Sequence, residues 1–591
     1  MACPDPHSCF DDSQSRARHW RLRLRVDFER KVLSGEAELR FERPAQGPLD
    51  LDTKGLTILS ASCREADVPF ELEGERPILG RRLRLRLPPG TRSVAIRYET
   101  SPEAMGLQWL SAAQTEGKRK PFLFSQCQAI HARSVLPCQD SPSARVTFEA
   151  ELDVPEGLSA VMGAGPLGDA PSGPGRRAWR FGMPQPIPSY LFALAVGELS
   201  SRELSSRCRV WAEPACVDKA AWEFAGVESM LAAAESLFGP YEWQRYDMLV
   251  LPPSFPYGGM ENPRMTFLTP TLLAGDRSLV DVVAHELAHS WTGNLVTNAT
   301  AEHFWLNEGF TVWAERRILK ALRGEEAASL AWAIGQKALD EELKRFKDRP
   351  ELTRLRAHLE GVDPDDAYSA VPYEKGARFL ACLERAAGQA EFDAFVKSYL
   401  ARYRFQSVAT EDFCRRVEER FPGLLAKVDA DAWLNKPGMP SDAPRFCSPR
   451  LNALAALAED WPKGRRPDPA LLRAAKPEEL LVFLQRLPQT LGPADCRWLD
   501  DNLGLTGRGN YEVLVQWLRL AAASGYQPAF ERVRRLLLEV GRMKYVRPLY
   551  LALGKTPPGR ALARRVFSEA AGSYHVLTRR AAESALAGYP A

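Results

Sequence analysis

The chain has 591 residues, which is too long for a single hydrophobic core, so we expect three or four domains. Apolar residues make up 45% and charged residues 26% of the sequence, a balance that excludes wholesale disorder, collagen-like repeats and a membrane-embedded bundle. With 78 Lys and Arg against 75 Asp and Glu, the net charge of +3 gives no general attraction to nucleic acid or to an anionic membrane.

The 11 cysteines are scattered and contain no Cys-x-x-Cys pair. Secreted disulfide frameworks are short and dense in cysteine, so we expect free thiols in a reducing compartment. The first residues lack the basic start and apolar stretch of a signal peptide, and no run of about 18 apolar residues offers a membrane span. We therefore expect a cytoplasmic protein.

Residues 1–200 alternate between apolar and polar side chains with a period of two, which is typical of half-buried antiparallel strands. The clearest run begins at Trp20, with arginines on the opposite face, and similar runs occur at 83–87 and 94–98. Because the net charge is balanced, we interpret the arginines as a solvated strand face rather than a nucleic-acid surface. The pattern predicts an N-terminal antiparallel β-sandwich or saddle.

From about residue 218 the apolar period becomes helical, and strand-like pieces at 248–251 and 265–268 flank a loop rich in Pro and Gly. The Pro-rich stretch at 436–452 predicts a linker, because proline interrupts helices. Beyond it, amphipathic patterns predict an all-helical domain of stacked helix pairs. The predicted units are thus 1–200, 201–435, the linker 436–452 and 453–591, with helices expected at 478–486, 511–523 and 529–540.

His285, Glu286 and His289 form a His-Glu-x-x-His motif in a predicted helix, which we expect Ser278 to cap and Gly293 to end. At positions i and i+4, both imidazoles leave the same helix face about one turn apart. That spacing lets them share one Zn²⁺. The motif is the strongest functional signal in the chain.

A catalytic zinc takes three protein ligands and keeps one position for water. We predict Glu308 as the third ligand, on a second helix expected at about 303–324. The alternative is an ordinary surface carboxylate. However, Glu308 is flanked by Trp305, Leu306 and Phe310, and an unpaired charge on so apolar a face would be expensive.

Glu286 has a defined role beside such an open site. A bound zinc lowers the pKa of its water toward about 7, and Glu286 lies on the same helical turn as the two histidines. It can take the proton from the water and later give it to a leaving amine. The arrangement predicts metal-assisted hydrolysis of an amide.

Three runs together carry a family resemblance: Tyr257-Gly258-Gly259-Met260-Glu261-Asn262-Pro263, the motif that starts at His285, and Asn307-Glu308-Gly309. The chain resembles the gluzincin zinc aminopeptidases, in particular the group of leukotriene A4 hydrolase and its bacterial-type aminopeptidase relatives. The resemblance covers nearly the whole chain. It implies a multidomain α+β protein with an N-terminal β-sandwich or saddle, a thermolysin-like zinc catalytic domain and a C-terminal all-α domain resembling helical repeats.

The same resemblance gives the glycine-rich loop a role in binding substrate. It implies that Glu261 recognises the free α-amine of a peptide, so that only the first residue is removed. Tyr257, Gly258, Gly259 and Met260 are implied to contact the substrate as well. The glycines let backbone N–H groups come close to its carbonyl. Read without the family, this loop is a plain Pro/Gly turn.

Further cleft residues are also implied by the family pattern. Gln126 and Gln128 match its glutamine pair, and Gln128 is implied to help hold the α-amine or the first side chain. Tyr373 matches the tyrosine that stabilises the oxyanion opposite the zinc, and Asp365 and Tyr368 match two further cleft residues. Each of these would otherwise be interpreted as an ordinary core or surface residue.

Arg542 and Lys544 match the basic pair that the helical domain points toward the carboxylate at the end of the substrate. A guanidinium forms a bidentate pair with a carboxylate, which suits this task. The alternative interpretation is a solvated helix end. If both ends of the cleft are closed in this way, short peptides are preferred.

Three hypotheses remain open at this point. The leading one is a zinc aminopeptidase with one Zn²⁺ per chain, acting on short peptides with a free N-terminus and working as a monomer. The second adds hydrolysis of a lipid epoxide as in leukotriene A4 hydrolase, although Ala301 replaces a tryptophan of that family near the pocket. The third is a metal-free peptide-binding scaffold, which the intact set of His285, His289, Glu308 and Glu286 argues against.

Overall fold

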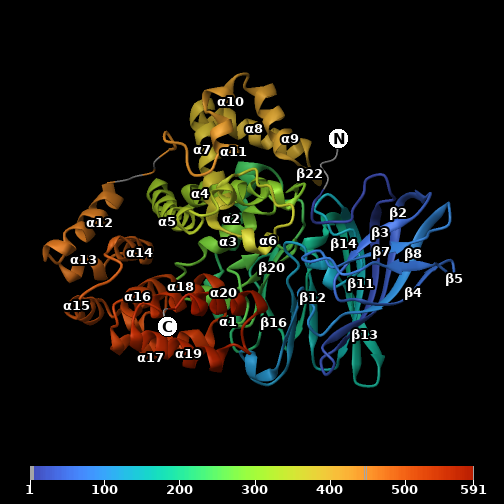
Figure 1. Ribbon diagram of the computed structural model, residues 1–591, viewed down its shortest axis with the longest axis horizontal. Helices are drawn as coiled ribbons and strands as arrows, with labels where there is room; N and C mark the ends of the chain where they lie inside the picture. The colour runs from blue at the N-terminus through green and yellow to red at the C-terminus, as the bar shows by residue number, and fades with distance from the viewer. Residues whose placement is uncertain (1–4, 445, 447–448, 590–591) are drawn as a thin grey trace.

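The computed structural model describes residues 5–444, 446 and 449–589. Figure 1 shows a β-rich domain, a central domain of mixed helices and strands, and a helical C-terminal domain, with the central domain between the other two. Each of the three has a large cluster of buried apolar side chains. The predicted fold class is confirmed.

The N-terminal domain is built on an eight-stranded sheet. Its strands, in spatial order, are β13 (Gly165–Gly173), β14 (Arg176–Pro188), β11 (Arg145–Pro155), β1 (Ala17–Asp27), β2 (Val32–Ala45), β8 (Thr91–Glu99), β4 (Thr57–Cys63) and β5 (Ala66–Asp67). All neighbours are antiparallel except β1 and β11, which run parallel with Trp20 opposite Phe148. The purely antiparallel expectation is wrong for this pair. Between β2 and β11 the chain forms the three-stranded sheet and two strands of the four-stranded sheet, and it re-enters beside β1 from the same end, as parallel pairing requires.

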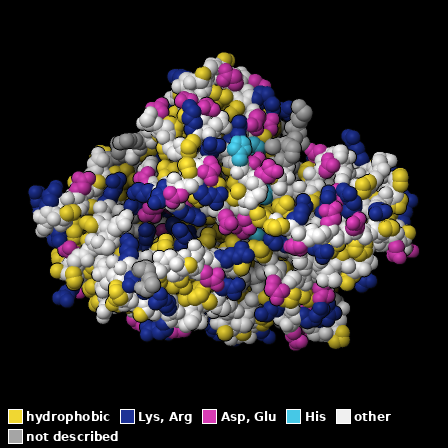
Figure 2. Space-filling model, in the orientation of Figure 1, with side chains coloured by type: hydrophobic (Ala, Val, Ile, Leu, Met, Phe, Trp, Pro, Cys, Tyr) yellow, Lys and Arg dark blue, Asp and Glu magenta, His cyan; other side chains and the backbone are white. Residues whose placement is uncertain are grey.

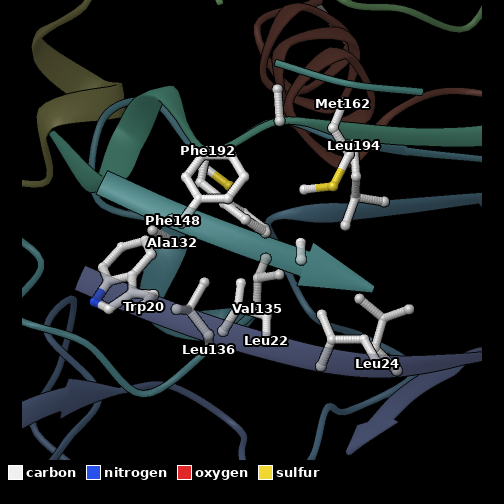
Figure 3. Packing of buried hydrophobic residues seen from close by; sticks show 14 of the residues in the cluster. Trp20, Leu22, Leu24, Ala132, Val135, Leu136, Phe148, Met162, Phe192 and Leu194 are labelled. Atoms are coloured by element: carbon white, nitrogen blue, oxygen red, sulfur yellow. The ribbon is translucent and has the colours of Figure 1, made fainter. Parts of the chain in front are cut away.

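The alternation read from the sequence at Trp20 is the burial pattern of β1. Trp20, Leu22 and Leu24 are buried, while the arginines between them face outward. Figure 3 shows Trp20 and Phe148 reaching across to Phe192. The rings meet edge to face, with centroid separations of 6.2 Å for Trp20–Phe192 and 5.4 Å for Phe148–Phe192. This aromatic contact joins the large sheet to the segment that leads into the central domain.

Two smaller sheets complete the N-terminal domain. The four-stranded sheet has the order β12 (Ser159–Met162), β15 (Leu194–Gly197), β10 (Phe122–Ser125) and β9 (Leu107–Leu110). The three-stranded sheet has the order β3 (Leu49–Thr53), β7 (Arg81–Leu85) and β6 (Phe70–Leu72). The segment after β10 carries Gln126 and Gln128 toward the central domain, so this domain takes part in the site.

The central domain combines a five-stranded sheet with packed helices. The sheet has the order β16 (Ser200–Glu203), β17 (Cys208–Ala212), β18 (Tyr246–Val250), β20 (Met265–Leu268) and β19 (Gly259–Met260). Helix α4 (Trp305–Arg323) lies at the centre and packs against α2 (Val227–Phe238), α3 (Asp281–Ala288), α5 (Glu325–Arg345) and α7 (Gly376–Ala387). Helices α8 (Gln389–Arg402) and α9 (Thr410–Arg420) pack beyond them.

The helix that carries the His-Glu-x-x-His motif is shorter than predicted. It begins at Asp281 without a side-chain cap and ends at Ala288, with His289 at its C-terminal boundary. Ser278 does not cap it; its hydroxyl bonds to Asp276, so the proposed capping role is wrong. The second predicted helix is α4, which ends at Arg323 just before Gly324, a glycine with φ of 84°.

The C-terminal domain is a stack of helices from α12 (Pro449–Glu459) to α20 (Val576–Ala587), confirming the all-helical prediction. The expected helices correspond to α14 (Pro477–Arg486), α16 (Tyr511–Ala523) and α17 (Phe530–Glu539). The predicted linker ends too late, because residues 449–452 form the first turn of α12. Pro449 begins that helix, a position where proline is well tolerated. Residues 445, 447 and 448 of the linker lie outside the described residues.

Among the described residues, all nine cysteines are unpaired, and no helix is both long and apolar enough to cross a bilayer. Cys3 and Cys447 lie outside the described part of the chain.

The three domains meet at a buried group of polar side chains. His131 comes from the N-terminal domain, Asp365 from α6 (Pro364–Ala367) of the central domain, and His575 from the start of α20. His131 Nε2 lies 2.9 Å from a carboxylate oxygen of Asp365. His575 Nδ1 accepts a hydrogen bond from the backbone N–H of Leu577, which caps α20. Burial, and next to it the charge of His131, lowers the pKa of His575 to about 3.

This lowered pKa predicts a loss of stability in mild acid. The unfolded chain binds a proton at His575 near pH 6.5, whereas the folded chain does not, so the free energy of unfolding falls as the pH drops below about 6.5. The slope for one such group is at most about 1.4 kcal/mol per pH unit. In His575→Asn, asparagine keeps the capping acceptor and does not titrate. Thermal unfolding midpoints between pH 7 and 5 should fall more steeply for the unmodified protein than for His575→Asn; parallel profiles would contradict this.

Candidate metal centre and cleft

Three potential ligand atoms converge between α3 and α4. The Nε2 atoms of His285 and His289 lie 3.2 Å apart, and one carboxylate oxygen of Glu308 lies 3.3 Å from the first and 3.4 Å from the second. A tetrahedral zinc bonds nitrogen or oxygen at about 2.0–2.1 Å, which sets its ligands about 3.3 Å apart. The observed triangle therefore has the dimensions of one face of a zinc coordination tetrahedron.

The charges in this triangle also suit a cation. Glu308 is buried, and one of its oxygens faces both imidazoles. Burial alone would raise the pKa of Glu308, but the charge of His289 and hydrogen bonds from both imidazoles bring it down to about 2. An ionised carboxylate and two imidazoles aimed at one point fit Zn²⁺ in both donor type and geometry.

Side chains behind the two imidazoles fix their orientation. His285 Nδ1 lies 3.0 Å from a carboxylate oxygen of Glu315, and His289 Nδ1 lies 3.2 Å from the carbonyl of Thr292 and 3.1 Å from the hydroxyl of Thr311. Such partners turn Nε2 of each ring toward the metal and raise its basicity. The sequence analysis missed Glu315. It lies seven residues after Glu308, on the same face of α4, and that spacing was the available signal.

Glu286 is held against the glycine-rich loop. A Cβ atom on Gly259 would lie 2.3 Å from its carboxylate, so only glycine allows the loop to pass this closely. Burial raises the pKa of Glu286 to about 7, against the opposing charges of His285 and His289. A carboxylate of this kind, beside the ligand triangle and against a loop that approaches substrate, can accept and return a proton.

Glu261 lies at the end of the same loop and adds a second buried carboxylate to the site. Its side chain is buried, with hydrogen bonds from Asn307 and from the amide of Gln128, the latter at 3.3 Å. Asn294 donates to the backbone carbonyl of Glu261 at 2.7 Å and fixes the loop. Gln126 instead donates to the sulfur of Met260, at 3.2 Å, and the Met260 side chain is buried in the core. Gln128 is therefore the member of the glutamine pair that reaches Glu261.

Tyr373 and Tyr368 line the other side of the ligand triangle. Tyr373 lies on a single π-helical turn, Val371–Lys375, and its ring stacks against His285 with centroids 6.0 Å apart. Its hydroxyl donates to that of Tyr368 at 3.0 Å. Burial raises the pKa of Tyr373 well above its ordinary value, so the phenol keeps its proton as a hydrogen-bond donor.

A contact between two glycines joins the two walls of the site. A Cβ on Gly309, directly after Glu308, would lie 2.7 Å from the Cα of Gly376 and 2.9 Å from the carbonyl of Pro372. Helix α4 and the turn that bears Tyr373 therefore touch backbone to backbone. This close approach is the physical reason for the glycine in Asn307-Glu308-Gly309.

An apolar cavity is lined by Tyr368, the hydrogen-bond partner of Tyr373. Tyr257 and Tyr368 line this cavity, and their ring centroids lie 5.8 Å apart. Gln128 and Asp365 line it as well. Its remaining walls are mostly apolar, and they include Ala301, Phe304, Leu352, Leu355, Ala357, Leu359 and Pro372. The alanine noted in the sequence analysis is thus part of this cavity wall.

Arg542 and Lys544 come from the start of α18 (Met543–Leu553). Arg542 is buried and lies against the loop, where a Cβ on Gly258 would be 2.6 Å from its guanidinium. Lys544 is exposed and pairs with Glu512 at 2.7 Å, and Arg542 lies 3.6 Å from the same carboxylate. Figure 2 shows Lys and Arg side chains gathered around a hollow between the central and C-terminal domains. Arg542 therefore lies against the glycine-rich loop, whereas Lys544 is paired with Glu512 at the surface.

The chain matches three family descriptions in succession. Residues 16–191 match the Peptidase M1 N-terminal domain, residues 222–433 the Peptidase family M1 domain, and residues 475–586 the C-terminal domain of leukotriene A4 hydrolase. The chain belongs to the M1 peptidase family. The enzyme class predicted from the sequence, a zinc-dependent metallo-aminopeptidase, is confirmed.

Its relatives cover almost the whole chain. A leukotriene A-4 hydrolase from Xenopus laevis is 41% identical over 92% of this chain and 93% of its own length. A leucine aminopeptidase 2 from Yarrowia lipolytica is 40% identical over 94% of this chain and 89% of its own length. Among solved structures, yeast LTA4 hydrolase in complex with bestatin superposes with a TM-score of 0.92 at 34% identity, covering 99% of this chain and 97% of that one.

The ligand triangle predicts distinct metal affinities for two variants. Glu308→Ala removes a ligand and should leave purified protein with little bound zinc. Glu315→Ala removes only the partner of His285 and should weaken zinc binding by about 10–100-fold. Atomic emission and competition with a chelator would measure both. Glu325→Ala, which loses only a surface pair with Lys320, serves as the control; equal zinc affinity in all three variants would contradict the assignment.

Proposed function

We propose that this chain removes the N-terminal residue from short peptides, using one zinc ion held by His285, His289 and Glu308. The observation that carries the proposal is the triangle of ligand atoms 3.2–3.4 Å apart, beside the buried carboxylate of Glu261, which forms no ion pair with Lys or Arg in the described part of the chain. The first feature supports a hydrolytic metal centre, and the second supports recognition of a free amine.

Glu261 is the proposed acceptor for the α-ammonium of the substrate. The buried carboxylate of Glu261 accepts hydrogen bonds from two side-chain amides, which do not neutralise its charge. A primary ammonium supplies three hydrogen-bond donors and the opposite charge. An internal peptide bond has no ammonium to offer, and placing an uncharged segment against Glu261 would leave the carboxylate buried and unpaired. The selection of chain ends thus follows from the cost of an uncompensated charge.

The proposed chemistry divides between the metal and four side chains. Zinc, when bound, supplies a polarised water and a Lewis acid at the scissile carbonyl. Glu286 takes a proton from that water and returns it to the leaving amine. The hydroxyl of Tyr373 donates a hydrogen bond to the carbonyl oxygen as negative charge develops there. Arg542 and Lys544 receive the carboxylate of a short peptide from the opposite end.

The apolar cavity is the proposed site for the first side chain. Its position next to Gln128 and Tyr257, and the name leucine aminopeptidase 2 of two relatives, support an apolar first residue. Hydrolysis of a lipid epoxide would also call on Asp365 and Tyr368. Both residues line the cavity proposed here for the first side chain of a peptide, so a role in peptide binding accounts for their positions equally well. No observation favours the epoxide reaction over peptide hydrolysis.

We further propose that the protein works as a monomer in the cytoplasm. The unpaired state of the nine described cysteines supports a reducing compartment. Each proposed site residue belongs to the same chain, so the site needs no second copy.

Replacing the proposed base should separate metal binding from turnover. Glu286→Gln keeps the size of the side chain but cannot accept the proton, so kcat should fall by about 10²–10⁴-fold. Zinc content should stay at one ion per chain. Hydrolysis of an aminoacyl chromogenic substrate would be measured together with atomic emission. A variant with full zinc and full activity would remove Glu286 as the base.

Acetylating the α-amine of the substrate should weaken binding in the same way as removing Glu261, its proposed acceptor. Glu261→Ala should raise KM for a tripeptide with a free N-terminus far more than Glu223→Ala, a substitution of another buried glutamate remote from the cleft. The N-acetylated tripeptide should be cut poorly by every variant. If the unmodified enzyme cut acetylated and free tripeptides at similar rates, the proposal of an aminopeptidase would fail.

A further inference from the structure

A second buried carboxylate lies directly behind the tyrosine of the site. Glu374 follows Tyr373 in the π-helical turn, and two guanidinium groups hold its carboxylate. Arg316 of α4 donates to its two oxygens at 2.6 and 3.1 Å, and Arg378 of α7 donates at 2.5 Å. All three side chains are buried. Burial alone would raise the pKa of Glu374, but the charges of Arg316 and Arg378 lower it.

The surroundings of this carboxylate are shaped to hold it in one place. A Cβ on Gly335 of α5 would lie only 2.1 Å from Glu374, so a glycine opens the slot that the carboxylate fills. The guanidinium carbon of Arg316 lies 4.1 Å from the centroid of the Trp332 ring. The backbone carbonyl of Trp332 accepts a hydrogen bond from Arg378 at 3.0 Å. Three helices thus contribute to a single arrangement of the group.

Stability alone is a poor reason for such a cluster. Taking a carboxylate and two guanidinium groups out of water is costly, and apolar residues of similar volume often serve as well or better. What a buried ionic cluster provides is a fixed geometry, because each hydrogen bond allows only a narrow range of positions. The question is therefore which group needs that geometry.

The cluster ties the Tyr373 turn to the helix of the third metal ligand. Arg316 and Glu308 both belong to α4, eight residues apart. Next to Glu308, the backbone of Gly309 contacts the backbone of Gly376. Further along α4, Arg316 forms an ion pair with Glu374. Glu374, Arg316 and Arg378 are all absent from the lining of the apolar cavity. The contacts of Glu374 run to α4, to α5 and to α7, and its link to the site is the turn that it shares with Tyr373.

We propose that Glu374, held by Arg316 and Arg378, is a positioning residue that sets the place of the Tyr373 hydroxyl relative to the metal ligands. The inference rests on the role proposed for Tyr373 above. A hydrogen-bond donor helps the reaction only if it meets the oxygen where charge develops, and a displacement of about 1 Å can cost about 10²-fold in rate.

The test compares Glu374→Gln with a matched control on the same pair of helices. Glu384 of α7 also accepts from α4, from Arg317 at 2.9 Å and Trp313 at 2.7 Å, but lies ten residues further from the turn. Glu374→Gln should lower kcat at least tenfold, with KM within about twofold and zinc content unchanged. Glu384→Gln should leave kcat within about twofold of the unmodified enzyme.

A double variant separates positioning from general damage. If Glu374 acts through Tyr373, adding Glu374→Gln to Tyr373→Phe should cause no further loss of kcat, because the positioned hydroxyl is already gone. Losses that multiply would overturn the inference, as would full kcat in Glu374→Gln. Full kcat in Tyr373→Phe would instead overturn the role of Tyr373, and this inference with it.

Gly335→Ala provides the same comparison if Glu374→Gln does not fold. It keeps the carboxylate and both guanidinium groups and displaces the Glu374 carboxylate through the added Cβ. A lower kcat that is absent in the Tyr373→Phe background supports positioning. An unchanged kcat, or a loss that persists without the hydroxyl, overturns it.

Discussion

The charge of Glu308 is the constraint on which the site depends. Its carboxylate is buried among aromatic side chains, where an isolated charge would cost several kcal/mol. Two imidazoles meet it at 3.3 and 3.4 Å, and the packing of α4 against α3 holds that meeting in place. A cation at the shared point removes the remaining cost. The proposed metal binding and the packing of the central domain would therefore be linked by one electrostatic requirement.

Glycines let the surrounding walls come close enough to act on that point. Gly259 admits the carboxylate of Glu286, Gly258 admits Arg542, and Gly309 admits the backbone near Tyr373. At each of the three positions an added Cβ would lie within 2.7 Å of another atom. The glycines of the two motifs are thus requirements of close contact between these segments and the groups packed against them.

Spacing along a helix made the metal ligands predictable, whereas contacts between distant segments were not. The i and i+4 relation of His285 and His289 is a property of the local backbone, and it survives although α3 is shorter than expected. The alternation at Trp20 likewise gave the buried face of β1. In contrast, the parallel pairing of β1 with β11 depends on the path of the chain between them. Likewise, no local pattern reveals that Gly335, from a different helix, makes room for Glu374.

The proposed recognition of a peptide end draws on all three domains. The N-terminal domain brings Gln128 to Glu261, the central domain supplies the ligand triangle, and the C-terminal domain brings Arg542 against the loop. The distance from Glu261 to Arg542 is set by how the domains pack, because no single helix or sheet carries both residues. A shift between domains would change the length of peptide that fits while leaving the ligand triangle intact. The contact of His131 with Asp365 joins the N-terminal and central domains and opposes a shift between those two.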